Sequence, residues 1–220
     1  MKKSFLVVGL GRLGIVIIEE LSKHNNVEIM AIDSNEDAVI KASEIIEHCL
    51  ICDSTSEAAL NQISFDGISQ AIVTIGGNIQ ATILTTILLK ERGVKKISVR
   101  IDDDHYEKIM YKIGADEVIF PERIAGIRYA NSIIRDNITD YFNVSDGYGI
   151  VQILITDKFK PQTLIELDSR NKYDVNIISI KRNKKVFIPK GSDTINPGDE
   201  VLVIGKDAKV AKFNSSINGK

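Results

Sequence analysis

The sequence feature that most constrains the fold is a glycine pattern that follows the first apolar run. Phe5 to Val8 is apolar, and Gly9, Gly11 and Gly14 then give the spacing G-x-G-x-x-G where a helix-period segment begins. In this context the first glycine makes a tight turn, the second lets the backbone approach a pyrophosphate, and the third permits close helix–strand packing. Free N–H groups at the helix N-terminus attract the anion. The pattern therefore predicts a phosphate-binding turn.

An acidic residue at the end of the second apolar run supports this prediction. The apolar run from Val27 to Ile32 is followed by Asp33, which lies 19 residues after Gly14 (33 − 14 = 19). A carboxylate at an offset of about 20 residues hydrogen-bonds the ribose hydroxyls of a dinucleotide. Asp33, followed by Ser34, also repels a 2′-phosphate, so the site favours adenosine nucleotides or NAD over NADP.

The first part of the chain repeats a short apolar run, a turn and a helix-period segment, which is typical of a parallel sheet covered by helices on both faces. The clearest helix begins after Asn78, which caps it, and stops at Gly93. Its predicted apolar face is Ile79, Ile83, Ile87 and Leu88. The predicted strands are Phe5 to Val8, Val27 to Ile32, Ile45 to Ile51, Gln70 to Ile75, Ile97 to Ile101 and Glu117 to Phe120.

A last helix after Pro121 closes this part, which we predict to be a Rossmann-like α/β domain over residues 1–138. The apolar stripe of this helix is Ile124, Ile127, Ala130 and Ile134. The other 82 residues (220 − 138 = 82) form a predicted small α+β domain over 139–220, with helices near Pro161 and after Gly205. Its predicted strands are Val151 to Ile155, Ile177 to Lys181, Val186 to Ile188 and Val201 to Ile204, and the polar end, Asn214 to Lys220, is expected to fray.

Two further residues, Arg12 and Asp53, are expected at the carboxyl edge of the sheet, which is the edge that binds ligands. Arg12 lies inside the glycine turn, where it either contacts phosphate oxygens or is an exposed helix residue. Asp53 either contacts adenosine or caps a helix. The predicted nucleotide site comprises Gly9, Gly11, Arg12, Leu13, Gly14, Asp33, Ser34, Asp53, Ser54 and Ile75.

Several function classes are disfavoured by composition and by missing motifs. Lys+Arg 28 against Asp+Glu 30 gives a net charge of −2, so nothing indicates nucleic-acid binding. No apolar stretch approaches the ~18–20 residues that span a bilayer, so a cytoplasmic protein is expected. Cys49 and Cys52 are interpreted as core residues, and the acids Asp102 to Asp104 as helix caps. No Tyr-x-x-x-Lys pair or partnered histidine is found, so we expect no enzyme.

The whole set of motifs resembles RCK (KTN) domains, in particular the cytosolic regulatory subunits of Ktr/Trk-type potassium uptake systems. The N-terminal resemblance rests on Val7 to Gly14, Asp33, Thr74 to Ala81, Lys112 to Asp116 and Phe120 to Glu122. Two C-terminal segments, Leu167 to Tyr173 and Ile195 to Gly205, resemble the C-terminal RCK subdomain.

The resemblance implies a homo-oligomer in which dimers form an octameric gating ring beneath a separate membrane subunit that conducts potassium. ATP and ADP, or NAD(H), would then be regulatory ligands, with Arg12 on the terminal phosphates. Glu122 would bind a cation (Mg, Ca or Na) near the γ-phosphate across the dimer; from the sequence itself it is a first-turn helix acid. The helix Ile124 to Ile134 would link nucleotide state to subunit packing.

The C-terminal subdomain of related subunits binds cyclic di-AMP between two protomers. Family members often have Ala and Gly where this chain has Asn171 and Asp174. The added carboxylate of Asp174 would weaken the binding of a phosphate-bearing ligand, because the two negative charges repel each other. A purely structural dimer interface is the alternative. By position, the candidates are Leu164, Ile165, Asp168, Arg170, Asn176, Ile177 and Pro189.

The favoured function is therefore a nucleotide-gated regulatory subunit of a potassium transporter. Two alternatives stay open at this point: an NAD-dependent oxidoreductase with a degenerate site, and a nucleotide sensor that acts without a channel.

Overall fold

The computed structural model describes residues 2–134 and 137–219, without the side chains of 131, 132 and 134. It divides into two compact units, Met1–Glu122 and Arg123–Lys220. The sequence placed a boundary after residue 138, whereas this division counts most of the helix after Pro121 with the second unit. Each unit is described separately below.

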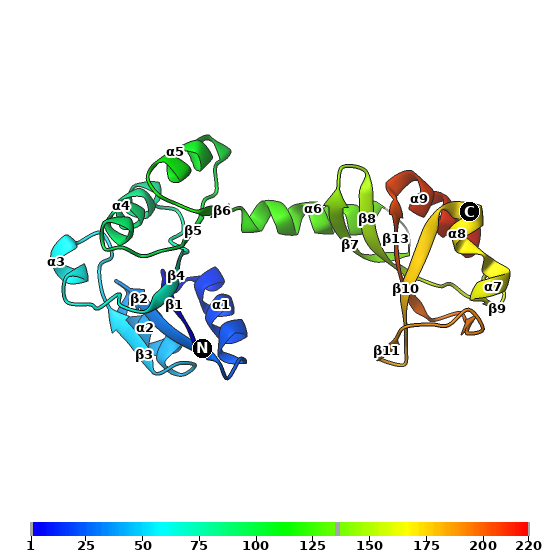
Figure 1. Cartoon of the computed structure of the whole chain (residues 1–220), viewed down its shortest axis with the longest axis horizontal. Coiled ribbons are helices and arrows are strands. Elements are labelled where there is room, and N and C mark those ends of the chain that lie inside the picture. Colours follow the sequence, from blue (N-terminus) through cyan, green and yellow to red (C-terminus); the bar gives the residue numbers. More distant parts are fainter. Residues whose placement is uncertain (1, 135–136, 220) are drawn as a thin grey trace. The chain divides into compact units, whose positions relative to one another are not determined.

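The first unit is built on a six-stranded sheet whose neighbouring strands all pair in parallel (Figure 1). Its order, β3-β2-β1-β4-β5-β6, reverses direction between β1 and β4, which is the position where such sheets bind ligands. The predicted Rossmann-like sheet is confirmed. The strands are β1 (Lys3–Val8), β2 (Val27–Asp33), β3 (His48–Ile51), β4 (Ile68–Val73), β5 (Ile97–Arg100) and β6 (Glu117–Ile119).

Helices cover both faces of this sheet, because side chains along a strand alternate between its faces. Leu6 and Val8 are buried in one apolar cluster with Leu60, Leu89 and Met110, which come from the helices of that face. Val7 belongs to the opposite cluster, with residues of α1 and α2. The helices are α1 (Arg12–Ser22), α2 (Glu36–Ser43), α3 (Glu57–Leu60), α4 (Ile79–Glu91), α5 (Glu107–Lys112) and the short 3-10 helix η1 (Asp104–Tyr106).

Helix α4 begins as predicted, since the Asn78 side chain accepts a hydrogen bond from the Ala81 N–H at 3.0 Å. Its buried face differs from the prediction. Leu88 is buried, but the rest of that face is Thr82, Thr85, Thr86 and Leu89. Two of these threonines can be buried because their hydroxyls donate to backbone carbonyls one turn earlier, as from Thr86 to Thr82 at 2.7 Å. The isoleucines of the predicted face are only half-buried.

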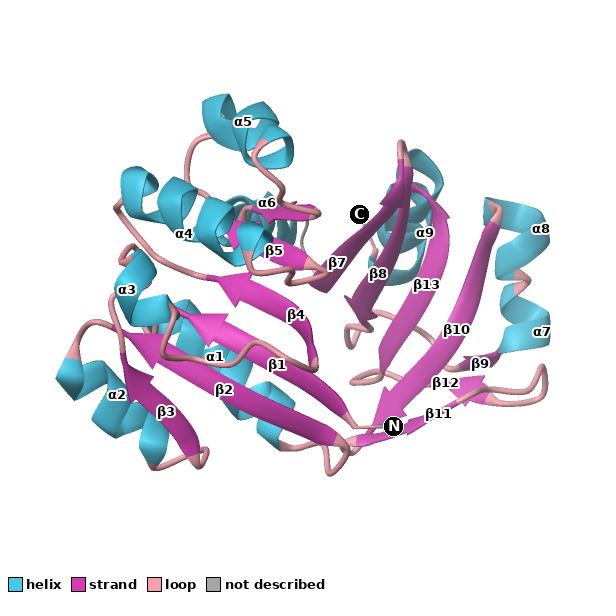
Figure 2. Ribbon diagram, turned by 60° about the vertical axis from the view of Figure 1, so that its left-hand side comes forward, coloured by secondary structure: helices cyan, strands magenta, loops and turns pink. Residues whose placement is uncertain are grey.

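The second unit holds a five-stranded antiparallel sheet with the order β11-β10-β13-β8-β7 (Figure 2). This confirms the predicted small α+β architecture. Its strands are β7 (Ile138–Ser145), β8 (Tyr148–Leu154), β10 (Val175–Arg182), β11 (Lys185–Phe187) and β13 (Glu200–Lys206), with a separate pair β9 (Gln162–Thr163) and β12 (Thr194–Ile195). The helices α7 (Leu164–Leu167), α8 (Ser169–Tyr173) and α9 (Asp207–Asn218) complete it, and α6 (Pro121–Ile134) precedes it.

The end of α9 is ordered by contacts that the sequence analysis missed. Residues after Asn214 were expected to fray, yet α9 continues to Asn218, and Ile217 and Asn218 are buried. The Asn218 side chain accepts from the Thr156 N–H at 2.8 Å and donates to the Leu154 carbonyl at 3.1 Å. It therefore satisfies backbone groups beyond the end of β8. Lys220 lies outside the described residues.

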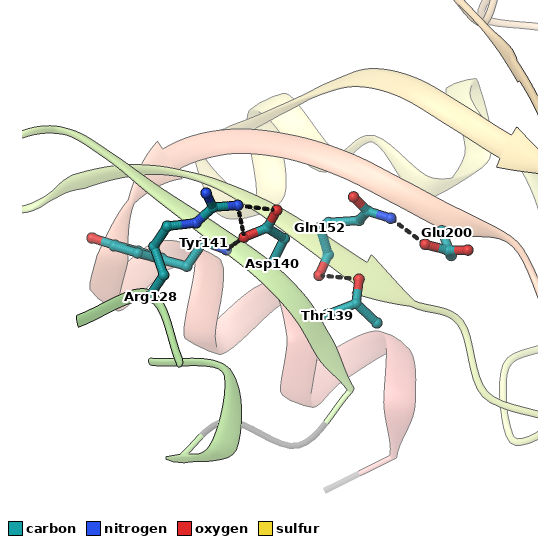
Figure 3. A network of polar contacts seen from close by, with 6 residues as sticks. All are labelled: Arg128, Thr139, Asp140, Tyr141, Gln152 and Glu200. Atoms are coloured by element: carbon teal, nitrogen blue, oxygen red, sulfur yellow. Dashed lines mark hydrogen bonds and ion pairs between the residues drawn. The ribbon is translucent and has the colours of Figure 1, made fainter. Parts of the chain in front are cut away.

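Helix α6 forms where predicted, but its apolar stripe is not buried. The Ile124 and Ile127 side chains are more than half exposed, while Ala130 is half-buried and the Ile134 side chain lies outside the description. Figure 3 shows how α6 joins the second sheet: Arg128 donates to both carboxylate oxygens of Asp140 on β7, at 2.8 and 3.0 Å. This fork explains why the helix belongs with the second unit.

Candidate functional site

The glycine turn between β1 and α1 is held closed by its neighbours. Gly9 has a φ of +92°, a conformation that favours glycine, and its N–H donates to the Ile32 carbonyl at 2.9 Å. The Thr74 hydroxyl donates to the Gly9 carbonyl at 2.5 Å. A Cβ on Gly9 would lie 2.9 Å from the Ile75 nitrogen, so a side chain there would collide with the end of β4. The first glycine is thus required for the tight turn.

The other two glycines differ in what surrounds them. A Cβ on Gly14 would lie 2.1 Å from the Gly9 carbonyl oxygen and 3.0 Å from the Thr74 hydroxyl, so close packing excludes a side chain. A Cβ on Gly11 would have no heavy atom within 4 Å. Gly11 therefore borders open space, which is where backbone would approach a bound phosphate.

Asp33 fixes the geometry of the turn from the end of β2. One carboxylate oxygen accepts the Leu10 N–H at 2.5 Å, and the other accepts the Asn35 N–H at 2.8 Å. Each carboxylate oxygen has a further lone pair available to a hydroxyl donor. The predicted ribose-binding residue is therefore already oriented beside the glycine turn.

These residues border a cleft of about 590 Å³ at the carboxyl ends of the strands. Of the predicted nucleotide site, Leu13 and Gly14 do not line the cleft, although Gly14 supports the turn. The predicted residues that do line it are Gly9, Gly11, Arg12, Asp33, Ser34, Asp53, Ser54 and Ile75. Lining residues outside the prediction include Thr55, Thr74, Asn78 and Arg100.

Asp53 lies in a tight turn after β3 and does not cap a helix. Its carboxylate accepts from the Thr55 N–H at 2.9 Å and from the Thr55 hydroxyl at 2.7 Å, and these bonds lower the pKa of Asp53. The cap of α3 is Ser56, so the helix-cap alternative for Asp53 is wrong. Ser54 contributes mainly backbone to the cleft, because its hydroxyl bonds to Thr85 at 2.8 Å.

Two arginines supply positive charge to the cleft. Arg12 is the exposed first residue of α1, and it forms no ion pair with any residue in the described part of the chain. It stands at the positive end of the helix dipole, which also attracts anions. Arg100, at the end of β5, donates to Asp102 at 2.8 Å and to Glu122 at 2.7 Å.

The role of Arg100 escaped the sequence analysis because no motif marks it. Its side chain is only 17% exposed, and its Nε is buried without a hydrogen-bond partner among the described residues. The usable signal was its place at the end of a predicted strand, two residues before the acids Asp102 to Asp104. Of these, Asp103 caps η1 as expected, since it accepts from the His105 N–H at 2.9 Å.

The predicted cation ligand Glu122 is exposed and paired with Arg100. Within residues 2–134 and 137–219, no three His, Cys, Asp or Glu side chains gather so as to hold a metal ion. Ligands for a cation at Glu122 would have to come in part from the nucleotide or from another subunit.

Comparison with known proteins gives the chain its family. The model of the TrkA-N domain matches residues 5–121, and the model of the TrkA-C domain matches residues 150–218. The chain is 41% identical over 218 residues to Ktr system potassium uptake protein C of Bacillus subtilis, covering 99% of this chain and 98% of that protein. The chain belongs to the RCK family. Ktr system potassium uptake protein A of the same bacterium is 35% identical, over 97% and 96%.

A solved RCK structure supports the fold of this family member. The GsuK RCK domain superposes with a TM-score of 0.50 at 20% identity, covering 99% of this chain. The chain spans about half of that protein, since 47% of the GsuK chain is covered. Within the described residues, no helix is long and apolar enough to cross a membrane.

The cysteines of this RCK protein lie in or next to the core, as predicted: Cys52 is buried, and Cys49 is half-buried against the opposite cluster. Cys52 is buried where it borders the cleft, and burial together with the nearby Asp53 charge raises the pKa of its thiol. Burial likewise raises the pKa of Cys49. A thiol of raised pKa stays protonated near neutral pH and is a poor nucleophile.

The residues carried over for cyclic di-AMP lie on or next to α7, α8 and β10 and in the segment after β11 of the TrkA-C domain. The N–H groups of Leu164 and Ile165 donate to carbonyls of Asp193 and Gly191, which brings α7 beside the segment that follows Pro189. Ile165 is 70% exposed there. Arg170 on α8 and Asn176 on β10 are also exposed, whereas Leu164, Asp168, Ile177 and Pro189 are partly buried.

Two residues that depart from the family pattern have clear local roles. Asp174 ends α8 with a φ of +58°, the left-handed conformation in which glycine is favoured, so the Gly of other members fits the same backbone. The Asn171 amide donates to Asp168 at 2.7 Å and so engages one of the candidate residues.

Proposed function

We propose that this protein is the nucleotide-binding regulatory subunit of a potassium uptake system, and that ATP and ADP, or NAD(H), are its regulatory ligands. The observation that carries the proposal is the cleft where Gly11 leaves open space beside Arg12 and Asp33 holds the turn. This arrangement offers N–H donors and a cation to phosphates and a carboxylate to ribose. The full-length similarity to Ktr system proteins supports a role in potassium uptake.

A regulatory role is supported over an enzymatic one by the chemistry of the cleft. Its described lining residues include no His, Lys or Tyr that could exchange a proton with a substrate. The one thiol there, Cys52, has a raised pKa. Binding would then act by differential affinity for two arrangements of the assembled subunits.

The proposed assembly is a ring of dimers, commonly an octamer, docked on an integral-membrane potassium-conducting subunit at the cytoplasmic face. Exposed Ile124 and Ile127 on α6 offer apolar surface for subunit packing. Glu122 would leave Arg100 to bind a cation beside the γ-phosphate of a neighbouring subunit.

The test is potassium flux through the co-purified membrane subunit in liposomes, with ATP or ADP inside. We expect the two nucleotides to give different flux, and Asp33→Ala, which removes the ribose ligand, to abolish the difference. Equal flux with both nucleotides would contradict the proposal. Purification without any membrane subunit would favour the stand-alone sensor, and oxidation of NADH with a candidate substrate would favour the oxidoreductase.

Arg12→Gln should weaken ATP binding more than ADP binding. The guanidinium strengthens hydrogen bonds to terminal phosphates, and such charge-assisted bonds contribute about 1.5–3 kcal/mol. We expect a rise of at least about tenfold in Kd for ATP in calorimetry. The matched control is Arg123→Gln, which removes the same charge outside the cleft. An equal loss of affinity for ATP and ADP would mean that Arg12 does not contact the terminal phosphates.

Asp174→Asn should tighten cyclic di-AMP binding. The change removes one negative charge near the proposed site, and repulsion of that size near a surface is about 0.5–1 kcal/mol, a roughly two- to fivefold lower Kd. Asp174→Gly should act similarly, because Gly accepts the left-handed backbone. Unchanged affinity in both variants would show that Asp174 does not face the ligand, and no binding by any variant would favour the structural dimer interface.

A further inference from the structure

A second cavity, in the TrkA-C unit, is bordered by lysines that no function accounts for. It measures about 230 Å³ and lies where the turn at Lys158 to Lys160, α8 and the end of α9 meet (Figure 1). Lys158, Lys160 and Lys172 line it together with Gln162, and no acidic side chain is among its described lining residues. None of its lining residues belongs to the set carried over for cyclic di-AMP.

The three lysines have no acidic partner among the described residues, as is true of most other lysines of this chain, and what sets them apart is that they line one cavity. Five lysines elsewhere pair with a carboxylate: Lys2, Lys23, Lys90, Lys96 and Lys181. Within the described residues, Lys158 and Lys160 form neither an ion pair nor a side-chain hydrogen bond. Lys172 donates to the Glu166 carbonyl at 3.0 Å, a neutral acceptor. Ammonium groups gathered around one space repel one another, and a bound anion would relieve that repulsion.

Helix ends alone do not explain this gathering. The carbonyl end of a helix attracts cations, which accounts for one lysine near the C-terminus of α9. A Cβ on Gly219, the last described residue, would lie 3.2 Å from Cδ of Lys158, so the hydrocarbon stem of that lysine lies beside the helix end. Lys172 lies in the last turn of α8 and donates to a carbonyl of α7, so helix ends account for it too, whereas Lys160 lies in no helix and still borders the same cavity.

The rest of the lining suits a small polar ligand on an apolar base. The hydroxyls of Tyr173 and Ser216 bond to each other at 2.5 Å, and with Gln162 they can supply further donors to an anion. Phe159, Leu167 and Ile217 are buried beneath them. At about 230 Å³ the cavity is less than half the size of the nucleotide cleft of about 590 Å³, so it suits a smaller ligand than a nucleotide.

We propose that this cavity is a binding site for a small phosphate-bearing anion, distinct from both nucleotide sites. Lysines hold phosphate as point charges, and three of them around one space favour a multiply charged group over a monovalent one. The ligand class follows from the charge, the hydroxyl and amide donors and the size of the cavity.

Lysine acetylation rates in the full-length protein, measured by peptide mass spectrometry at constant ionic strength, test this site with pyrophosphate as the probe. We expect pyrophosphate to slow acetylation of Lys158, Lys160 and Lys172 at least threefold, while Lys184 and Lys185 react unchanged. In K158Q/K160Q, the protection of Lys172 should disappear. In the matched control K184Q/K185Q, which removes two charges from the turn between β10 and β11, it should persist.

Three results would overturn the proposal. Equal acetylation rates with and without pyrophosphate would mean that the cavity binds no phosphate group. Protection of the same lysines by cyclic di-AMP would make the cavity part of that site. Protection by vesicles containing phosphatidic acid, without protection by pyrophosphate, would identify a lipid surface as the occupant.

Discussion

Replacing Gly14 by alanine should destabilise the TrkA-N unit, whereas replacing Gly11 should leave it folded and impair mainly ligand binding. The Gly14 methyl would lie 2.1 Å from the Gly9 carbonyl oxygen, and backbone cannot move aside as a flexible side chain can. Overpacking of this kind costs about 1–3 kcal/mol. The Gly11 methyl would touch nothing, and because alanine is a poorer N-cap than glycine the change costs only about 0.5–1 kcal/mol.

Urea unfolding and nucleotide calorimetry measure the two effects separately. Gly11→Ala should raise the Kd for ATP and ADP at least about tenfold, equivalent to ~1.4 kcal/mol, while lowering the free energy of unfolding less than Gly14→Ala does. Each variant controls for the other, because both add one methyl group to the same turn. Unchanged nucleotide affinity in Gly11→Ala would mean that no phosphate lies against the backbone of Gly11. Wild-type stability in Gly14→Ala would contradict the close packing of Gly14 against Gly9.

Asp199→Asn should produce the largest loss of stability in the TrkA-C unit. Both Asp199 oxygens accept from Arg182 at 2.7 Å, one also accepts from the Asn196 N–H at 2.8 Å, and the carboxylate is 2% exposed. An amide accepts through one oxygen only, so the guanidinium loses half of its fork. Breaking a fully buried pair costs ~3–5 kcal/mol; because the Arg182 side chain is 37% exposed, we expect about 2–3 kcal/mol.

The control for this change is Lys181→Gln, next to Arg182 on β10. Lys181 pairs with Glu200 at 2.8 Å, but both side chains are more exposed, and such surface pairs contribute about 0–1 kcal/mol. Thermal unfolding should show the TrkA-C transition fall in Asp199→Asn while the TrkA-N transition stays. A loss no larger than that of the Lys181 variant would show that the Arg182 fork does not stabilise the unit.

The parallel sheet and the nucleotide cleft could be predicted because their signals are local in the sequence. Gly9 to Gly14 and Asp33 encode turn, helix start and strand end by their spacing alone. Arg100 could not be found in this way, since its role depends on a fold that brings the ends of β4 and β5 to the same cleft. Contacts between residues far apart in the sequence produce no local pattern from which they could be predicted.

Two other elements, β7 in the second unit and α4 in the first, also differ from the prediction, each for a local reason. Strand β7 was not predicted because its pairing with β8 has two register irregularities, which break the alternation that reveals a strand. In α4, Leu88, Ile79 and Ile83 do pack against the core as predicted, but polar threonines also face inward and bond to their own helix, which hydrophobicity alone does not reveal.

The polar end of α9 also has a practical consequence for work with this protein. The Asn218 side chain accepts a hydrogen bond from the Thr156 N–H and donates one to the Leu154 carbonyl, so it satisfies the backbone on both sides of residue 155. The neighbouring Ile217 is only 4% exposed. Trimming the chain before these two residues would leave the Thr156 N–H and the Leu154 carbonyl without these partners and open the core to water. Shortened versions prepared for crystallisation should therefore retain residues up to Asn218, and proteases should find few sites there while the unit is folded.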